Sequence, residues 1–130
     1  MRHKIEFKAS NIKYKIFEVV NKKTNERFIE ITQNKRPVVN KKSLLNPSIV
    51  EGYATNFIRR TKQGFYYSFE FGNRHHYEYE FHFKLIKNDY FLYKVKKSYV
   101  DMANPSSSKV SIIPVNAIKF TSYDVSNYTK

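Results

Sequence analysis

The sequence predicts an all-β protein, an antiparallel meander that forms a β-sandwich or a partly open barrel with at most one short helix. The main observation is the stretch from Gly64 to Lys97, where aromatic and polar residues alternate with a period of two, as in strands with one buried face. A second is a pair of apolar segments near the N-terminus that a polar, turn-rich connection separates. The length of 130 residues indicates a single β domain over residues 1–130.

The N-terminal half is expected to form a hairpin followed by an irregular basic segment. Residues 21–26 are the polar hairpin connection, and residues 34–48 should be a basic loop because Pro37 and Pro47 exclude a central strand. The Asn-Pro pair at 46–47 and the following Gly52 fit the start and end of one helical turn. The strands predicted in this half are Lys4–Lys8, Ile12–Val20, Arg27–Gln33 and Ala54–Arg60.

The aromatic stretch predicts three antiparallel strands whose register follows from parity, since facing residues share one side of a sheet. The first turn, around residues 72–76, should place Phe71 opposite Tyr77 and Tyr67 opposite Phe81. A three-residue turn at 87–89 is preferred over a two-residue turn, which would set apolar against polar parity. It predicts the pairs Ile86–Tyr90, Phe83–Tyr93, His82–Lys94 and Glu80–Lys96.

This register gives one aromatic core face and one solvated, salt-bridged face. The expected core residues are Phe69, Phe71, Tyr79, Phe81, Phe83, Phe91, Tyr93 and Val95. The opposite face should expose Glu78, Glu80, Lys94 and Lys96, with no burial that would raise a carboxyl pKa.

The C-terminal region is expected to contain a loop and two short strands. Residues 104–108 read as a loop, and the last strands are predicted at Val110–Ile113 and Ala117–Tyr123. Pro114 should mark a break or a sheet edge, and the final residues should fray.

The net charge of +13 is uneven and favours an acidic partner. Residues 1–63 hold 15 Lys and Arg against five Glu, and residues 64–130 hold nine against six acids. A solvated lysine-rich surface is the plain alternative. The candidate partner-binding residues are Lys35, Arg36, Lys41, Lys42, Arg59, Arg60, Lys62, Arg74, His75 and His76.

No catalytic or cofactor motif stands out, so we expect no enzymatic activity, no cofactor and no metal. The chain has no cysteine, and Lys94 and Lys96 would compete with a cation for the carboxylates of the His-x-Glu-x-Glu-x-His segment at 76–82. Two alternatives remain open. A small basic ribonuclease toxin would use Arg74, His75, His76, Tyr77 and His82, and a nucleic-acid-binding module would stack bases on exposed rings such as Tyr66 and Tyr90.

No segment is long and apolar enough to span a bilayer, and the first ten residues lack the apolar core of a signal peptide. The localisation stays open between the cytoplasm and a mature exported form whose leader has been removed.

Three segments together resemble a known group of proteins. They are NKKTNERFIEI, then SIVEGYATNF with FYYSFEF, and then EYEFHFKLIKNDYFLYKVKKSYVDM with the later AIKFTSYDV. This order, over Ile12 to Val125, resembles small bacterial proteins, often exported or lipid-anchored, that accompany polymorphic or contact-delivered toxins. The resemblance implies an immunity-type role, in which the chain binds a cognate toxin or effector and neutralises it. From the charge alone we expect only weak, non-specific binding of nucleic acid. The chain departs from the group at its N-terminus, which has no lipid-attachment cysteine.

Overall fold

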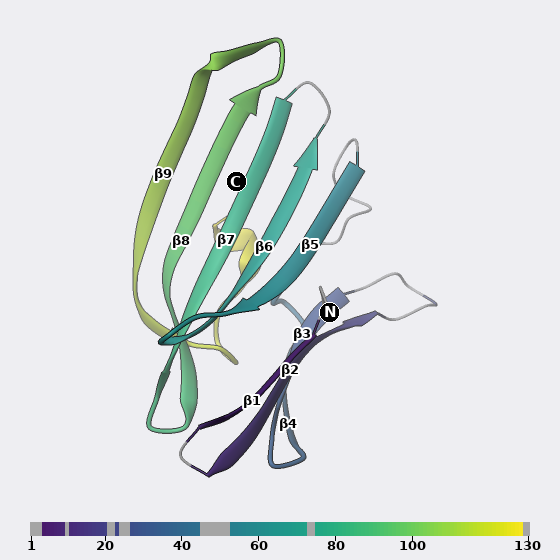
Figure 1. Ribbon diagram of the computed structural model, residues 1–130, viewed down its shortest axis with the longest axis vertical. Coiled ribbons are helices and arrows are strands. Elements are labelled where there is room, and N and C mark those ends of the chain that lie inside the picture. Colours follow the sequence, from purple (N-terminus) through teal and green to yellow (C-terminus); the bar gives the residue numbers. More distant parts are fainter. Residues whose placement is uncertain are drawn as a thin grey trace.

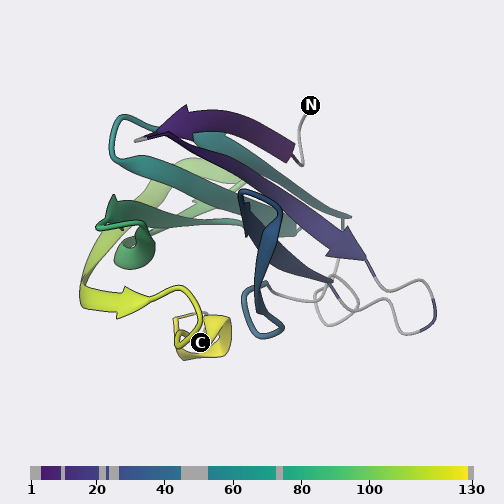
Figure 2. The ribbon, with the colours of Figure 1, turned by 90° about the horizontal axis from the view of Figure 1, so that it is seen from below.

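The computed structural model describes residues 4–9, 11–20, 23, 27–44, 53–72 and 75–128, which form two antiparallel sheets (Figures 1 and 2). Sheet A has the strand order β1-β2-β3-β4 and sheet B the order β5-β6-β7-β8-β9, so each sheet is a meander. Within the described residues the sheets do not close into a barrel, and the predicted all-β, sandwich-like fold is confirmed. The elements are β1 (Lys4–Ala9), β2 (Ile12–Val20), β3 (Arg27–Gln33), β4 (Arg36–Asn40), β5 (Tyr53–Arg60), β6 (Gly64–Gly72), β7 (His75–Ile86), β8 (Asp89–Asp101), β9 (Asn104–Lys119) and the 3-10 helix η2 (Val125–Asn127).

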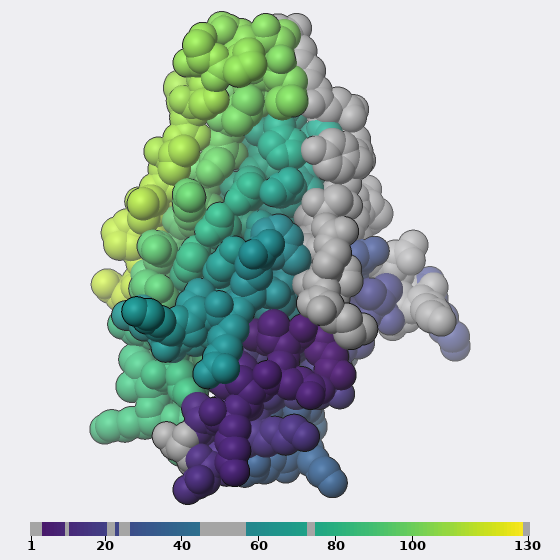
Figure 3. Space-filling view, in the orientation of Figure 1, coloured from purple at the N-terminus to yellow at the C-terminus, as the bar shows by residue number. Residues whose placement is uncertain are grey.

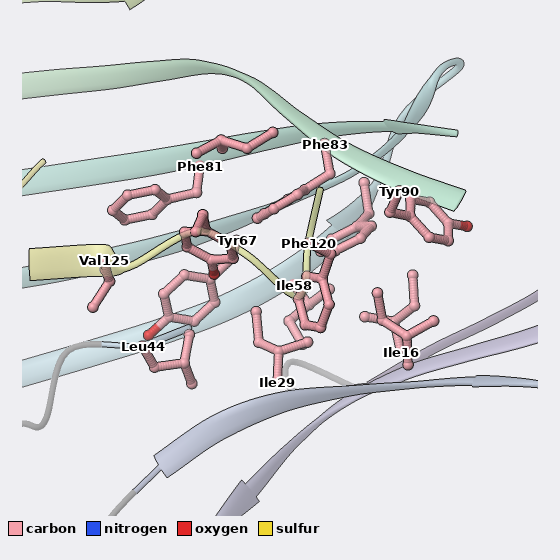
Figure 4. Close-up of a cluster of buried hydrophobic side chains, with 14 of the residues drawn as sticks. Ile16, Ile29, Leu44, Ile58, Tyr67, Phe81, Phe83, Tyr90, Phe120 and Val125 are labelled. Atoms are coloured by element: carbon pink, nitrogen blue, oxygen red, sulfur yellow. The ribbon is translucent and has the colours of Figure 1, made fainter. Parts of the chain in front are cut away.

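The hydrophobic core lies between the inner faces of the two sheets and includes the segment after β9. Figure 4 shows Phe81 and Phe83 of sheet B on one side of this core and Ile16 and Ile29 of sheet A on the other. Aromatic rings fill most of the space, and Phe65 stacks on Phe83 with ring centroids 4.7 Å apart. The buried apolar residues are Tyr14, Ile16, Ile29, Ile31, Leu44, Ile58, Phe65, Tyr67, Phe69, Tyr79, Phe81, Phe83, Tyr90, Leu92, Val95, Phe120, Tyr123 and Val125.

In sheet A the predicted strands are confirmed, and one further strand was missed. The hairpin of β2 and β3 has the predicted bounds, and β1 pairs with β2. The expected basic loop is wrong at Arg36–Asn40, which forms β4. Pro37 is tolerated because β4 is an edge strand that pairs only with β3 among the described residues. The predicted helical turn at 46–52 lies outside the described residues.

In sheet B the first aromatic hairpin has the predicted register. Phe71 faces Tyr77 and Tyr67 faces Phe81 across β6 and β7. Gly72 adopts a φ of +126°, a conformation that glycine accepts more readily than other residues. Strand β5 also confirms the strand predicted at Ala54–Arg60.

The β7–β8 hairpin differs from its predicted register in the half next to the turn. Lys87 and Asn88 both have positive φ, of 49° and 69°, and form a two-residue turn that pairs Ile86 with Asp89. A register shift then adds Tyr93 to β8, so that Phe83 faces Leu92 while His82 still faces Lys94.

This shift changes which β8 side chains are buried. Tyr90 and Leu92 lie in the core, whereas Phe91 and Tyr93, which were expected there, are half-buried. Glu80 still faces Lys96, as predicted, because the added residue compensates for the shorter turn.

Strand β9 replaces the predicted loop and two strands at the C-terminal end of sheet B. It runs through residues 104–119, although its pairing with β8 skips from Asn104 to Lys109, so residues 105–108 bulge out of the ladder. The predicted strand at Ala117–Tyr123 ends at Lys119. Pro114 lies within the strand and is tolerated at the sheet edge.

The segment after β9 packs into the core and is held to the residues around the end of β4. The Asn40 side-chain amide donates to the carbonyl oxygens of Phe120 and Tyr123 at 2.6 and 2.8 Å. The Tyr123 hydroxyl donates to the Ser43 carbonyl at 2.6 Å, and the Val125 amide donates to the Lys42 carbonyl at 2.9 Å. The Tyr128 ring centroid lies 6.3 Å from that of Phe81, so this residue packs against the core.

Candidate binding surfaces

The predicted basic site does not form one surface. One group, near one end of the sandwich, comprises Lys35, Arg36, Arg59, Arg60 and Lys62. At this end the Gln33 side-chain amide donates to the Asn88 backbone carbonyl at 2.7 Å and so joins the β3–β4 and β7–β8 turns. Lys41 and Lys42 follow β4, and Lys42 lies 3.9 Å from Asp124. His75 and His76 start β7 at the opposite end of sheet B, and Arg74 lies outside the described residues. The nine described residues of the set therefore form at least three separate groups.

Neighbouring basic residues also point to opposite faces. The Arg59 guanidinium lies 4.8 Å from the ring centroid of Phe57 on the outer face of sheet B. Arg60 lies 4.4 Å from the ring centroid of Phe7 in β1 and joins the two sheets. These cation–π contacts give both arginines a structural role.

The two histidines at the start of β7 also point to opposite faces of sheet B and have different partners. The His75 ring nitrogen Nδ1 lies 2.7 Å from the Tyr99 hydroxyl, and its ring stacks on that of Tyr99. His76 Nε2 lies 3.5 Å from a carboxylate oxygen of Glu70. His82, the third histidine of the ribonuclease alternative, bonds instead to Glu80 at 2.9 Å.

A carboxyl cluster on the outer face of sheet B is more buried than the sequence indicated. Glu70 faces Glu78 across β6 and β7, and Glu80 is two residues further along β7. Glu78, Glu80, Lys94 and Lys96 were expected to be exposed but are half-buried, because long side chains on adjacent strands cover one another.

The pKa values of Glu78, Glu80 and His82 are shifted, contrary to the prediction of an unperturbed face. Burial, with hydrogen bonds to Glu80 and Glu70, raises the pKa of Glu78 to about 8. Burial opposes ionisation of Glu80 too, but hydrogen bonds from Glu78 and His82 and the charge of Lys96 hold its pKa below the usual value. Burial, together with Lys94 and Lys96, lowers the pKa of His82 despite its bond to Glu80. At neutral pH Glu78 therefore keeps its proton and donates a hydrogen bond to Glu80.

The side chains of this cluster bond mainly to one another and to neighbouring side chains of the same face. Within the described part of the chain, no three His, Asp or Glu side chains converge in a way that could hold a metal ion. The two rings proposed for base stacking are also occupied, because Tyr90 is buried and Tyr66 stacks on His82 with centroids 4.9 Å apart.

A hollow of about 610 Å³ opens on the outer face of sheet A. Its lining mixes charges of both signs around Phe17, including Lys13, Lys15, Glu6 and Glu30. Lys15 lies 5.2 Å from the centroid of the Phe17 ring, and Glu6 pairs with Lys4 at 2.9 Å. The charges partly neutralise one another, so the hollow favours no single class of ligand.

Sequence reasoning missed an apolar surface on β9, which we call the β9 patch and define as Val110 and Ile112. Val110 and Ile112 are each 61% exposed and Ile113 is 37% exposed, and Met102 at the tip of the same hairpin is 59% exposed. Figure 3 shows the β8–β9 hairpin, green to yellow-green, along the upper left flank of the molecule. The uncharged run from Val110 to Ile113 was the available signal, but it also suits a buried strand.

No protein-family model, no curated protein and no solved structure matches this chain. Among the described residues, no helix is long and apolar enough to cross a membrane.

Proposed function

We propose that this chain is a non-enzymatic binding protein of the immunity type, which binds a cognate bacterial toxin or effector protein and neutralises it. The observation that carries the proposal is the β9 patch, where apolar side chains of an edge strand are exposed together. Exposed apolar clusters with a polar rim are typical of protein–protein interaction sites. On the adjacent strand Ser98 faces Val110 and Lys96 faces Ile112, and these polar residues supply such a rim on the same face.

Two further features support a protein partner over a nucleic acid. Arg59 and Arg60 of the predicted basic site are held against Phe57 and Phe7, and the described basic residues are spread over separate groups. The described basic residues therefore do not form the continuous basic groove along which a nucleic-acid backbone binds. The apolar patch offers burial that a phosphate backbone cannot use.

The test is co-expression with the product of the adjacent gene, followed by purification of a complex. We expect a stoichiometric complex, protection of cells from that product, and loss of both when Ile112→Lys places a charge in the patch. Val39→Lys, at a 38% exposed valine of β4, is the matched control and should leave both unchanged. Failure to protect cells, or sub-micromolar and sequence-selective binding to RNA or DNA, would contradict the proposal.

A further inference from the structure

The described sheets have four edge strands, and three of them are protected from pairing with another chain. Strands β1 and β5 lie close together, with Arg60 of β5 over Phe7 of β1. Strand β4 is five residues long and contains Pro37, and its last residue, Asn40, bonds to the C-terminal segment. Strand β9 is sixteen residues long, and no described residue pairs with its outer edge (Figure 1).

The free edge is regular only in its central part, from Lys109 to Pro114. In this part each residue pairs in sequence with β8, from Tyr99–Lys109 to Lys94–Pro114. The register shifts on both sides of it, and Pro105 and Pro114 remove amide donors. The hydroxyl groups of Ser107 and Ser108 donate to the carbonyls of Asn104 and Pro105.

The central part is also uncovered on both faces. Val110 and Ile112 lie on the outer face, beside Ser98 and Lys96 of β8. The alternate residues Lys109, Ser111 and Ile113 lie on the inner face. All five β9 residues from 109 to 113 are exposed. Natural edge strands are usually shortened, charged or covered, because their unpaired N–H and C=O groups otherwise recruit another strand. Lys109 is the single charge in this part, so the usual protection is weak.

We infer that the central part of β9 accepts an extended segment of the partner protein as a sixth strand of sheet B. This inference rests on the proposed function and specifies how its partner binds. Main-chain hydrogen bonds to the edge would provide affinity, and side chains at alternate positions would pack beside Val110 and Ile112. A segment with apolar residues at every second position fits this geometry.

The positive charge around the β9 edge favours a partner segment that carries acidic residues. Residues 94–119 carry five lysines and one aspartate. Lys109 lies on β9 itself, and Lys96 and Lys97 are on the adjacent strand opposite Ile112 and Ser111. An aspartate or glutamate beside the apolar positions would complement this field, whereas a second copy of the chain would bring the same excess of lysines and a net charge of +13.

The probe is a synthetic ten-residue peptide that alternates valine and threonine between aspartates at both ends, tested on the full chain by fluorescence anisotropy and hydrogen exchange. We expect it to bind and to protect backbone amides in residues 109–113. A peptide with lysines in place of the aspartates should bind at least tenfold more weakly. Ile112→Lys should weaken binding at least tenfold, and Val39→Lys should not.

N-methylation of the peptide separates strand addition from side-chain contact alone. Alternate N–H groups of an added strand point toward the edge, so methylating one alternate set should abolish binding and methylating the other should preserve it. Equal binding of both methylated peptides, no binding below 1 mM, or a dimer in solution that Ile112→Lys dissociates would overturn the inference.

These outcomes are distinct from failure of the proposed function. If the adjacent gene product forms a protective complex that Ile112→Lys breaks, yet the amides of 109–113 gain no protection, strand addition is wrong and the proposed function stands. If no protective complex forms, the proposed function fails whatever the peptides do.

Discussion

Replacing Leu92 and, separately, Tyr93 with alanine tests the register shift in the β7–β8 hairpin. Leu92 is 0% exposed and faces Phe83, whereas Tyr93 is half-buried on the outer face between Lys84 and Lys94. Truncating a fully buried leucine removes its transfer free energy and leaves a cavity, at a cost of about 2–5 kcal/mol. Tyr93→Ala loses partial packing and two cation–π contacts of about 0.5–1 kcal/mol each. Leu92→Ala should therefore be the more destabilising variant.

The free energies of unfolding are measured by urea denaturation with circular dichroism, and the comparison requires unchanged m-values. Phe81→Ala is the reference, because both registers bury Phe81 and its loss should cost about 3–5 kcal/mol. The register without the shift pairs Phe83 with Tyr93 and turns Leu92 outward, which reverses the order of the two variants. A larger loss for Tyr93→Ala than for Leu92→Ala would refute the shift.

Three further predictions concern the C-terminal segment, the carboxyl cluster and nucleic-acid binding. Tyr123→Phe leaves the Ser43 carbonyl without its hydroxyl donor and should cost about 1–3 kcal/mol in urea denaturation, whereas the exposed-side control Tyr93→Phe should be nearly neutral. The pKa of Glu78 is raised to about 8, so its contribution to stability is fully present below its unfolded value of 4.5 and is lost as the pH rises through 8. Glu78→Gln should flatten this fall between pH 5 and pH 8.5, and an unchanged slope would contradict the assignment. Filter binding at physiological salt should give dissociation constants for RNA and DNA of about 1 μM or weaker, with the affinity falling steeply as salt is added, and the protein should not degrade RNA.

The parts of the fold that were predictable are those with an unbroken alternation and a polar connection. Strands β2 and β3 have the predicted bounds, because apolar parity holds through both and residues 21–26 are polar throughout. The β6–β7 pairing was predictable for the same reason, since a one-residue slip would turn the whole aromatic set toward solvent.

The β7–β8 hairpin shows where this reasoning stops. A two-residue turn of this kind needs positive φ at both positions, and the sequence places Lys87 and Asn88 there instead of the usual glycine pair. The added residue at Tyr93 has no sequence signal, because Tyr and Leu fit a core face equally well. Two local departures from regular pairing therefore cancelled, leaving Glu80 opposite Lys96 in both registers.

The candidate site was less predictable than the fold, because a charge is visible in a sequence and its partner is not. Arg59 and Arg60 looked equivalent, yet one packs on Phe57 of its own strand and the other on Phe7, far away in the chain. The Val110–Ile113 run was predicted as a strand, and only the sheet order shows that β9 is an edge of the described sheet with both faces uncovered. In that position the pairing of β9 with β8 must outweigh the free-energy cost of leaving its apolar side chains in water. A sixth strand from a partner would remove part of that cost, because it would bury these side chains.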